Sequence, residues 1–453
     1  MRKWILAAII GLLALAAVGS WGYSRQVAGR NLENYLNNKY QRAFYDLANQ
    51  AQNLEVLLSK TLVASDPRLD SALLMDIRQQ AAFAQSNLSQ LPLNDALAGR
   101  TAKFLSQVGD YAGSLARQIS QGEAIDSKNW DTLKSLYEQS VELNRDLQGI
   151  QASVARNNFY FGEMLRQVRS KLQKAPDNLA RTDFQTMDER MRRYPALLYD
   201  GPFSEHLERA EPRYLSGRGN VGAPEAEQKA LAFVDKRGGA EYQAKVTGPA
   251  GGRIPAHRVE VVPAGGGDGA VTVLDVSQQG GEVIWMLNSR PLGDQAVSIE
   301  DARRKAEDFL AGRGYGEMRS TYFLRQGNSA TFNFAALQDG VTLYPDLVKL
   351  TVALDNGEVI GTETSGYLMS HRRRDLPKAG VSREQALAAI NPRLEASGGS
   401  LALIPVGVTD EELAYEFQGK MGEDNYLIYV NAVNGREENV LKLIETPGGI
   451  LTM

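Results

Sequence analysis

The stretch YPALLYDGPFSEH, residues 194–206, brings together the residue types of a hydrolase site. Ser204 could be a nucleophile, His206 a general base, and Asp200 or Glu205 the acid that orients the base. Such a site works only when nucleophile, base and acid converge in space. Ser204 does not lie in the GxSxG turn that presents the serine of many hydrolases. The catalytic interpretation therefore depends on groups that the local sequence does not position.

The same stretch has a structural interpretation, which we prefer. Gly201 and Pro202 would turn the chain, and Asp200 would cap that turn. Large apolar and aromatic side chains beside the turn would be buried against an adjoining domain. They are Tyr194, Leu197, Tyr199 and Phe203. We therefore predict that residues 194–206 form a joint between two parts of the protein, with contact to a partner as the remaining functional interpretation.

Neighbouring carboxylates raise a second catalytic hypothesis, because glycosidases place two carboxyl groups about 5 to 10 Å apart. The chain has 54 acidic residues, so adjacent acids also arise by chance. One pair falls in the first turn of a predicted helix, where the helix dipole favours negative charge. A cell-wall hydrolase that uses paired carboxylates is thus the alternative to a non-enzymatic protein. Its candidate pairs are Glu300/Asp301, Asp410/Glu411, Glu423/Asp424 and Glu437/Glu438.

The composition gives little basis for a metal or cofactor. The chain has no cysteine, which excludes disulfides, thiol nucleophiles and iron–sulfur clusters. Its three histidines, His206, His257 and His371, match no zinc-binding spacing. The basic run from His371 to Arg374 could dock phosphates or an anionic polymer, but we interpret it as a solvated linker between two repeats. Since the net charge is −4, we predict no nucleic-acid partner, and we expect no cofactor and no metal.

The N-terminus predicts a membrane segment. Residues 4–23, WILAAIIGLLALAAVGSWGY, carry no charge, and about 20 apolar residues are what a helix needs to cross a bilayer. A cleaved signal peptide is the alternative, because Ala14, Ala16, Ala17 and Gly19 offer small residues at a cleavage site. We expect residues 1–24 to be a transmembrane anchor or an uncleaved signal, with the remaining chain on the extracytoplasmic side.

Residues 25–200 predict a helical bundle. Alanine, leucine and glutamine are abundant, and apolar residues recur at three- and four-residue steps. Asp66 followed by Pro67 predicts an N-cap and a first helical position, and so a break between the first two helices. Short breaks between long amphipathic helices predict antiparallel neighbours, as in an all-α bundle. We interpret residues 201–222 as a linker.

The rest of the chain contains three repeats, each with an alanine-rich helix followed by strands. The helices are expected at residues 224–234, 298–310 and 382–390. Each repeat ends in a strand pair whose turn needs a glycine with positive φ. The turn residues are Gly281, Asn356, Gly357, Asn434 and Gly435. Because these turns are about 75 to 80 positions apart, a domain-sized spacing, we predict three small α+β domains in tandem at residues 223–292, 293–376 and 377–453.

These repeats resemble PepSY domains. Three of them behind a helical region and an N-terminal anchor resemble the YpeB family of spore germination proteins, and the YP-x-L-x-YDGPFS stretch is similar to one found there. The first repeat departs from the pattern in its turn, Gln-Gly-Gly, and in an insertion at Gly265, Gly266 and Gly267. The residues that match the family motif are Tyr194, Pro195, Tyr199, Asp200, Gly201, Pro202, Phe203 and Ser204.

The resemblance implies a protein of sporulation and germination with no catalytic residue. YpeB-like proteins are partners of the cortex-lytic enzyme SleB, each needed for the stable presence of the other, and support cortex peptidoglycan breakdown. PepSY domains are regarded as inhibitory or chaperoning modules. The resemblance thus implies a SleB-type partner, contact with peptidoglycan, and a place at the spore inner membrane or the cortex boundary. An anchored sensor whose repeats bind a peptide or small ligand is a third hypothesis.

Overall fold

The computed structural model describes residues 2–91, 95–122, 124–157, 211–235, 241–264, 271–406, 410–446 and 449–453. The chain forms two compact units. The first consists of Met1–Leu62 and Asp70–Asp183, and the second consists of Val63–Leu69 and Phe184–Met453. The short segment Val63–Leu69 therefore belongs to the second unit, although it joins the first two helices of the chain.

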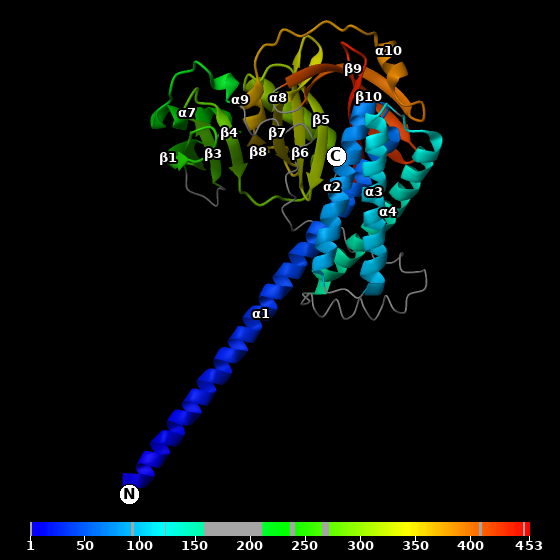
Figure 1. Cartoon of the computed structure of the whole chain (residues 1–453). Helices are drawn as coiled ribbons and strands as arrows, with labels where there is room; N and C mark the ends of the chain where they lie inside the picture. Colours follow the sequence, from blue (N-terminus) through cyan, green and yellow to red (C-terminus); the bar gives the residue numbers. More distant parts are fainter. Residues whose placement is uncertain are drawn as a thin grey trace. The chain divides into compact units, whose positions relative to one another are not determined.

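The first unit is helical. Among its described residues the helices are α1 (Arg2–Val63), α2 (Pro67–Gln90), α3 (Asp95–Ser120) and α4 (Ser127–Asn157). Figure 1 shows α2, α3 and α4 alongside the C-terminal part of α1. The predicted apolar stripe of α1 is buried from Phe44 onward, with Leu54 and Leu58 fully buried, whereas Tyr35 is exposed. Helices are therefore present in the predicted region as far as Asn157, and Asp66 and Pro67 mark the predicted break, while residues 158–200 of that region lie outside the described residues.

Polar side chains connect the four helices to one another. Asn144 on α4 donates a hydrogen bond of 2.7 Å to Glu55 on α1, and the indole of Trp130 donates one of 2.9 Å to the carbonyl of Leu62. Similar bonds join α1 to α2, α2 to α3, and α3 to α4. Because buried polar groups need such partners, these bonds help to fix the register of the helices.

The predicted transmembrane helix is wrong. Among the residues that the structure describes, no helix is both long enough and apolar enough to cross a membrane. Residues 4–23 are instead the beginning of α1, which continues without a break through the polar sequence that follows, as far as Val63. Trp21 and Tyr23, at the end of that apolar stretch, are exposed side chains on this helix.

The second unit contains one 13-stranded sheet. Its strands are β1 (Tyr242–Ala250), β2 (Ala256–Pro263), β3 (Thr272–Ser277), β4 (Val283–Asn288), β5 (Met318–Gln326), β6 (Ser329–Gln338), β7 (Val341–Ala353), β8 (Val359–Glu363), β9 (Glu395–Val406), β10 (Asp410–Met421), β11 (Asp424–Asn431), β12 (Glu437–Thr446) and β13 (Gly449–Thr452). The helical elements are η2 (Arg213–Leu215), α7 (Ala223–Phe233), α8 (Ile299–Gly312), α9 (Ser365–Ser370) and α10 (Arg383–Ala389). The strand order is β1-β2-β3-β4-β8-β7-β6-β5-β13-β12-β11-β10-β9.

The sheet corrects the prediction of three separate small α+β domains. Each repeat does contain its helix, α7, α8 or α10, followed by four strands in the first two repeats and by five, β9 to β13, in the third. However, β4 of the first repeat pairs with β8 of the second, and β13 pairs with both β12 and β5. In addition, β7 and β9 pair in parallel and close eight strands into a ring. The repeats join because unpaired strand edges would leave backbone donors and acceptors unsatisfied.

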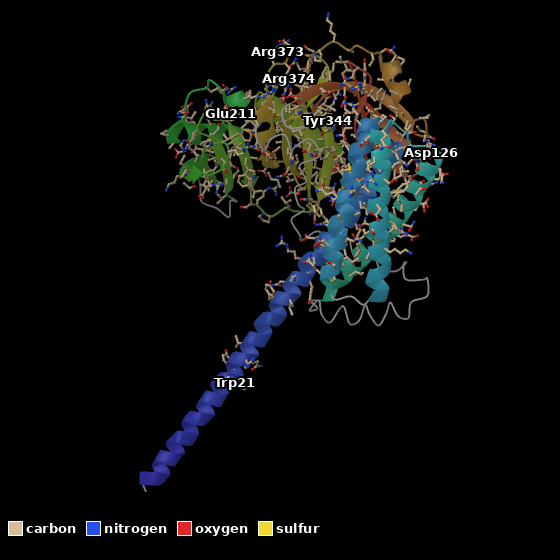
Figure 2. All side chains as sticks on the ribbon, in the orientation of Figure 1. Trp21, Asp126, Glu211, Tyr344, Arg373 and Arg374 are labelled. Atoms are coloured by element: carbon tan, nitrogen blue, oxygen red, sulfur yellow. The ribbon has the colours of Figure 1, made fainter. Side chains whose placement is uncertain are left out.

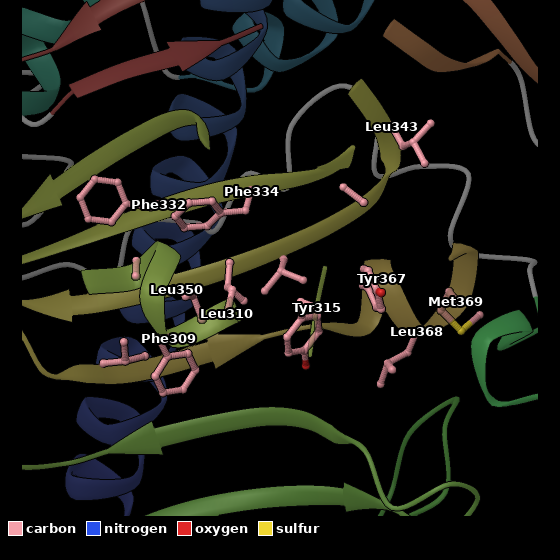
Figure 3. Close-up of a cluster of buried hydrophobic side chains, with 14 of the residues drawn as sticks. Phe309, Leu310, Tyr315, Phe332, Phe334, Leu343, Leu350, Tyr367, Leu368 and Met369 are labelled. Atoms are coloured by element: carbon pink, nitrogen blue, oxygen red, sulfur yellow. The ribbon is translucent and has the colours of Figure 1, made fainter. Parts of the chain in front are cut away.

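One apolar core runs through all three repeats. It includes Val259 on β2, Phe332 on β6 and Phe417 on β10, each fully buried. Figure 3 shows Phe332 and Phe334 of β6 among the buried side chains of the second repeat, which include Phe309 and Leu310 of α8. The alanines of the repeat helices face this core because a small side chain lets a helix approach a sheet closely. Those that are fully buried are Ala226, Ala230, Ala302, Ala306 and Ala386.

Substitution of Gly380 is expected to destabilise the third repeat. Its amide donates to the carbonyl of Ala432, and a Cβ at this position would lie closer to the carbonyl oxygen of Val433 than real Cβ atoms come to backbone. Gly380→Ala should therefore lower the free energy of unfolding in urea by about 1–3 kcal/mol. Gly219→Ala is the matched control, since Gly219 precedes α7 much as Gly380 precedes α10 and a Cβ there meets no atom within 4 Å. Equal stability of the two variants would contradict this packing.

Candidate functional site

The residues of the family motif lie outside the described residues. These are Tyr194, Pro195, Tyr199, Asp200, Gly201, Pro202, Phe203 and Ser204, and the same holds for Glu205 and His206. Their assignment to a structural joint therefore stays a prediction. The acidic pairs, the basic run and the repeat turns fall within the described part of the chain.

The three repeat turns share one hydrogen-bonding pattern. Gly281, Gly357 and Gly435 have φ values of 68°, 79° and 76°, in the left-handed region that favours glycine. Each turn is closed by a backbone bond between residues five apart: Ser277 and Glu282, Ala353 and Glu358, Asn431 and Arg436. Positions can therefore be matched from one repeat to another by structure alone.

The segment before each repeat helix bonds to the turn of the same repeat. The amide of Val221 donates to Gln278, that of Val297 to Leu354, and that of Val381 to Ala432, over 2.7 to 3.1 Å. In each repeat the segment that leads into the helix is thus hydrogen-bonded to the turn of the hairpin. This contact joins the first and last elements of each repeat.

An arginine reinforces that contact in the second repeat. Arg290 binds both carboxylate oxygens of Asp355 at 2.6 Å, and its Nε binds Glu358 at 2.8 Å. The side chain of Arg290 is only 7% exposed. The hydrogen bonds from Arg290 hold the pKa of Asp355 well below its usual value, although partial burial opposes this shift. Asp355 also accepts from the amide of Gly293, so the carboxylate is fixed on two sides.

A second ionic cluster connects the second and third repeats. Arg374 follows α9, Asp346 lies on β7, and Glu411 lies on β10. The guanidinium binds both oxygens of Asp346 at 2.8 Å and both oxygens of Glu411 at 2.8 and 2.9 Å. The side chains of Arg374 and Asp346 are 4% and 0% exposed. One cation is thus shared between two carboxylates from different strands.

The two carboxylates keep this arginine charged. Burial alone would lower the pKa of Arg374, but the hydrogen bonds to Glu411 and Asp346 outweigh burial and raise it. Burial also opposes ionisation of Glu411, and Arg374 nevertheless lowers the pKa of that carboxyl. Each charge is therefore stabilised by its partner rather than by water, and loss of Arg374 would leave Asp346 buried without a guanidinium, while Arg372 would still contact Glu411 at 3.0 Å.

The prediction that His371 to Arg374 form a solvated linker is wrong for Arg374. Arg373 is 82% exposed, whereas its neighbour Arg374 is buried (Figure 2). The sequence signal that could have revealed the cluster is Asp346, a charged residue flanked by Pro345 and Leu347 in β7. A carboxylate inside such a strand requires a buried cation or donor, and none of its sequence neighbours supplies one.

His371 forms the one arrangement in this cluster that resembles catalytic geometry. Its Nδ1 lies 2.7 Å from Asp346, and its ring stacks on Tyr367 with centroids 4.1 Å apart. A general base also needs a nucleophile, and no described serine or threonine hydroxyl hydrogen-bonds to the His371 ring. Asp346 is moreover shared with Arg374. The pair thus fixes the orientation of the His371 ring within the cluster.

The candidate carboxylate pairs have local partners. Glu300 and Asp301 lie in the first turn of α8, as predicted, and bind Arg303 and Arg304. Glu411 belongs to the Arg374 cluster, and Glu437 lies at the third repeat turn. Among the described residues, no group of three or more histidine or acidic side chains is arranged to hold a metal ion.

Comparison with known proteins defines the class of this one. A family described as "YpeB sporulation, PepSY1 and PepSY2 domains" matches residues 180–377, so the chain contains PepSY repeats. A second family description, "YpeB N-terminal", matches residues 28–163. The Sporulation protein YpeB of Halalkalibacterium halodurans is 30% identical over 443 residues, which are 96% of this chain and 97% of that protein. The chain therefore belongs to the YpeB family of sporulation proteins.

Other relatives extend this similarity. The Sporulation protein YpeB of Bacillus subtilis is 26% identical over 446 residues, 98% of each chain. The solved Bacillus megaterium YpeB C-terminal domain is 31% identical, with a TM-score of 0.44, and covers 50% of this chain and 100% of its own. The family is not a known family of hydrolases.

Arg374 is expected to stabilise the fold far more than its neighbour. Arg374→Ala removes the cation that Asp346 and Glu411 share, and Arg372, which is 3.0 Å from Glu411, does not replace it at Asp346, so the free energy of unfolding should fall by about 3–5 kcal/mol. Arg373→Ala removes an exposed side chain and should change it by less than about 0.5 kcal/mol. Urea unfolding of the two full-length variants measures the difference, and similar values for both would contradict the role of the cluster.

Asp355 should contribute stability in a pH-dependent way. Its pKa in the folded protein is lower than its ordinary value of 3.8, so its contribution is complete above pH 3.8 and is lost as the pH falls further. The stability difference between the wild type and Asp355→Asn should therefore narrow as the pH is lowered below about 4. Asp339→Asn is the control, because Asp339 is exposed and should show little difference at any pH. A constant difference for Asp355→Asn would argue against the Arg290 contact.

Proposed function

We propose that this protein acts in germination as a non-enzymatic partner of a spore cortex-lytic enzyme of the SleB type. In this role it keeps the enzyme stable, localised or restrained, and so supports hydrolysis of cortex peptidoglycan. The place of action is the extracytoplasmic side, at the cortex boundary of the spore, with peptidoglycan as a second contact.

The observation that carries this proposal is the similarity to sporulation proteins of the YpeB family over nearly the whole chain. A second observation supports it. Among the described residues, acids of the candidate carboxylate pairs are bound to structural partners, as Glu411 is to Arg374 and Glu300 to Arg303. Groups held in this way fix the positions of strands and helices and are not poised for proton transfer.

Deletion of the gene tests the proposal directly. Spores without the protein should contain much less of the cognate lytic enzyme, and their cortex should persist after germination is triggered. Re-expression of the wild-type chain should restore both. Normal enzyme levels together with normal cortex loss in the deletion would contradict the proposed role.

A direct assay separates this role from the hydrolase alternative. The purified full-length chain should release no muropeptides from isolated cortex. Release that is abolished by one acid-to-amide substitution at an exposed acid of a candidate pair, for example Glu423→Gln, would identify a hydrolase instead. Arg373→Ala serves as a control for substitutions that leave the fold intact.

A further inference from the structure

The third repeat has a carboxylic acid where the other two repeats have a core valine. The strand pairs of the three turns match Val276 with Val283, Val352 with Val359, and Val430 with Glu437. Val283, Val359 and Glu437 are each 3% exposed. A buried carboxyl costs free energy unless it is hydrogen-bonded. Because two repeats fill this position with an apolar side chain, the packing of the turn does not require an acid there.

Glu437 uses both of its oxygens to bind Ser65. The amide of Ser65 donates to Oε1 over 2.9 Å, and the Ser65 hydroxyl lies 2.9 Å from Oε2. The same hydroxyl lies 2.9 Å from the carbonyl oxygen of Ala389, at the end of α10. These contacts lie within the second unit, to which the segment Val63–Leu69 belongs.

The number of hydrogens determines the charge of this carboxyl. The Ser65 hydroxyl has one hydrogen, and the carbonyl of Ala389 can only accept. If the hydroxyl donates to Ala389, the contact with Oε2 is a hydrogen bond only when Glu437 is protonated and donates to Ser65. An ionised Glu437 takes the hydroxyl hydrogen for itself, and the Ala389 carbonyl then faces an oxygen without a donor. All three contacts are satisfied in the protonated form and only two in the ionised form.

The surroundings also favour the protonated form. Burial raises the pKa of Glu437 to about 7, and the negative charge of Asp66 on the same segment adds to this effect, while bonds from Ser65 oppose it. Glu438 on β12 and Glu412 on β10 are the other acids nearby, and burial and Glu412 raise the pKa of Glu438. The cation that faces this group is Arg68, which is 3.6 Å from Glu438 and 3.3 Å from Asp66. Arg68 thus pairs with acids other than Glu437.

We propose that Glu437, Ser65 and the Ala389 carbonyl form a proton-dependent joint, which holds the segment Val63–Leu69 against the third repeat while Glu437 is protonated and loosens it when Glu437 ionises. Two contacts of the segment do not titrate. Val63 is fully buried in the core, and the Asn391 side chain donates to the carbonyl of Ala64 over 3.3 Å. Ionisation therefore loosens the middle of the segment, around Ser65, and leaves its beginning in place. The joint does not depend on the proposed function in germination.

Amide hydrogen exchange of the full-length protein at pH 6 and pH 8 tests this joint. A carboxyl whose folded pKa is raised supports the closed form at low pH, and that support is lost as the pH rises through the folded pKa. Protection of the Ser65 amide, corrected for the intrinsic effect of pH on exchange, should fall about tenfold from pH 6 to pH 8. The Gly357 amide, which donates to Ala353 in the second repeat turn, is the internal reference and should not change. If protection of the Ser65 amide and of the Gly357 amide changes equally between pH 6 and pH 8 in the wild type, the proposal is overturned.

If the joint exists, two substitutions at Glu437 have opposite effects on protection of the Ser65 amide. Glu437→Gln keeps an acceptor for the Ser65 amide and a donor for its hydroxyl but cannot titrate, so protection should be high at both pH values. Glu437→Val restores the residue of the other two repeats, so the sheet should fold while protection of Ser65 is low at both pH values. A Glu437→Gln protein that retains the tenfold change would overturn the proposal. If Glu437→Gln does not fold, Glu437→Val decides alone: loss of the pH dependence supports the joint, and its persistence contradicts it.

Discussion

Backbone pairing between strands of different repeats is the constraint on which the second unit depends. A repeat of one helix and four or five strands has two open edges, and each edge exposes donors and acceptors that need partners. Here β4 pairs with β8, β5 with β13, and β7 with β9, so the repeats satisfy one another's edges. The remaining edge, β1, has a bulge between Val246 and Gly248, and the amide of Val246 donates to Glu227 of α7. The pairing of backbone donors and acceptors at strand edges thus explains why the three repeats form one sheet.

Charged side chains then fix the repeats at particular positions. Arg374 joins β7 to β10 through two carboxylates, and Arg290 joins the beginning of the second repeat to its last turn. Both arginines are buried, so water cannot replace a lost partner. The third repeat uses a carboxyl and a serine at its turn in place of an arginine and a carboxylate. This difference gives the third turn a carboxyl that forms more hydrogen bonds when it is protonated than when it is ionised.

The sequence predicted local structure well and long-range pairing poorly. Apolar periodicity located the helices of the first unit, and the cap at Ser382 with Gln385 is present as a capping box. These features depend on neighbours within a few residues. The pairing of β4 with β8 depends on edges about 75 positions apart, and no local pattern encodes it. The transmembrane prediction, which rested on the single apolar window of residues 4–23, is contradicted, since no helix among the described residues is long and apolar enough to cross a membrane.

The same distinction applies to the candidate sites. Neighbouring acids were visible in the sequence, but their partners were not, because Arg374 and Asp346 are 28 positions apart and Ser65 and Glu437 are 372 positions apart. A single basic run therefore contained both an exposed side chain, Arg373, and a buried one, Arg374. From the sequence we assigned Arg373 and Arg374 the same role. Only the three-dimensional structure shows that one side chain is exposed and the other buried.

The central claim is that the three repeats form one cooperative body through their shared sheet. Native-state hydrogen exchange at increasing denaturant tests it most directly, because it gives the opening free energy of each strand. We predict that central amides of β3, β7 and β11 exchange through a common opening, with the same free energy and the same dependence on denaturant. Separate openings for the three repeats, each with its own free energy, would show that they are independent domains and would contradict this account.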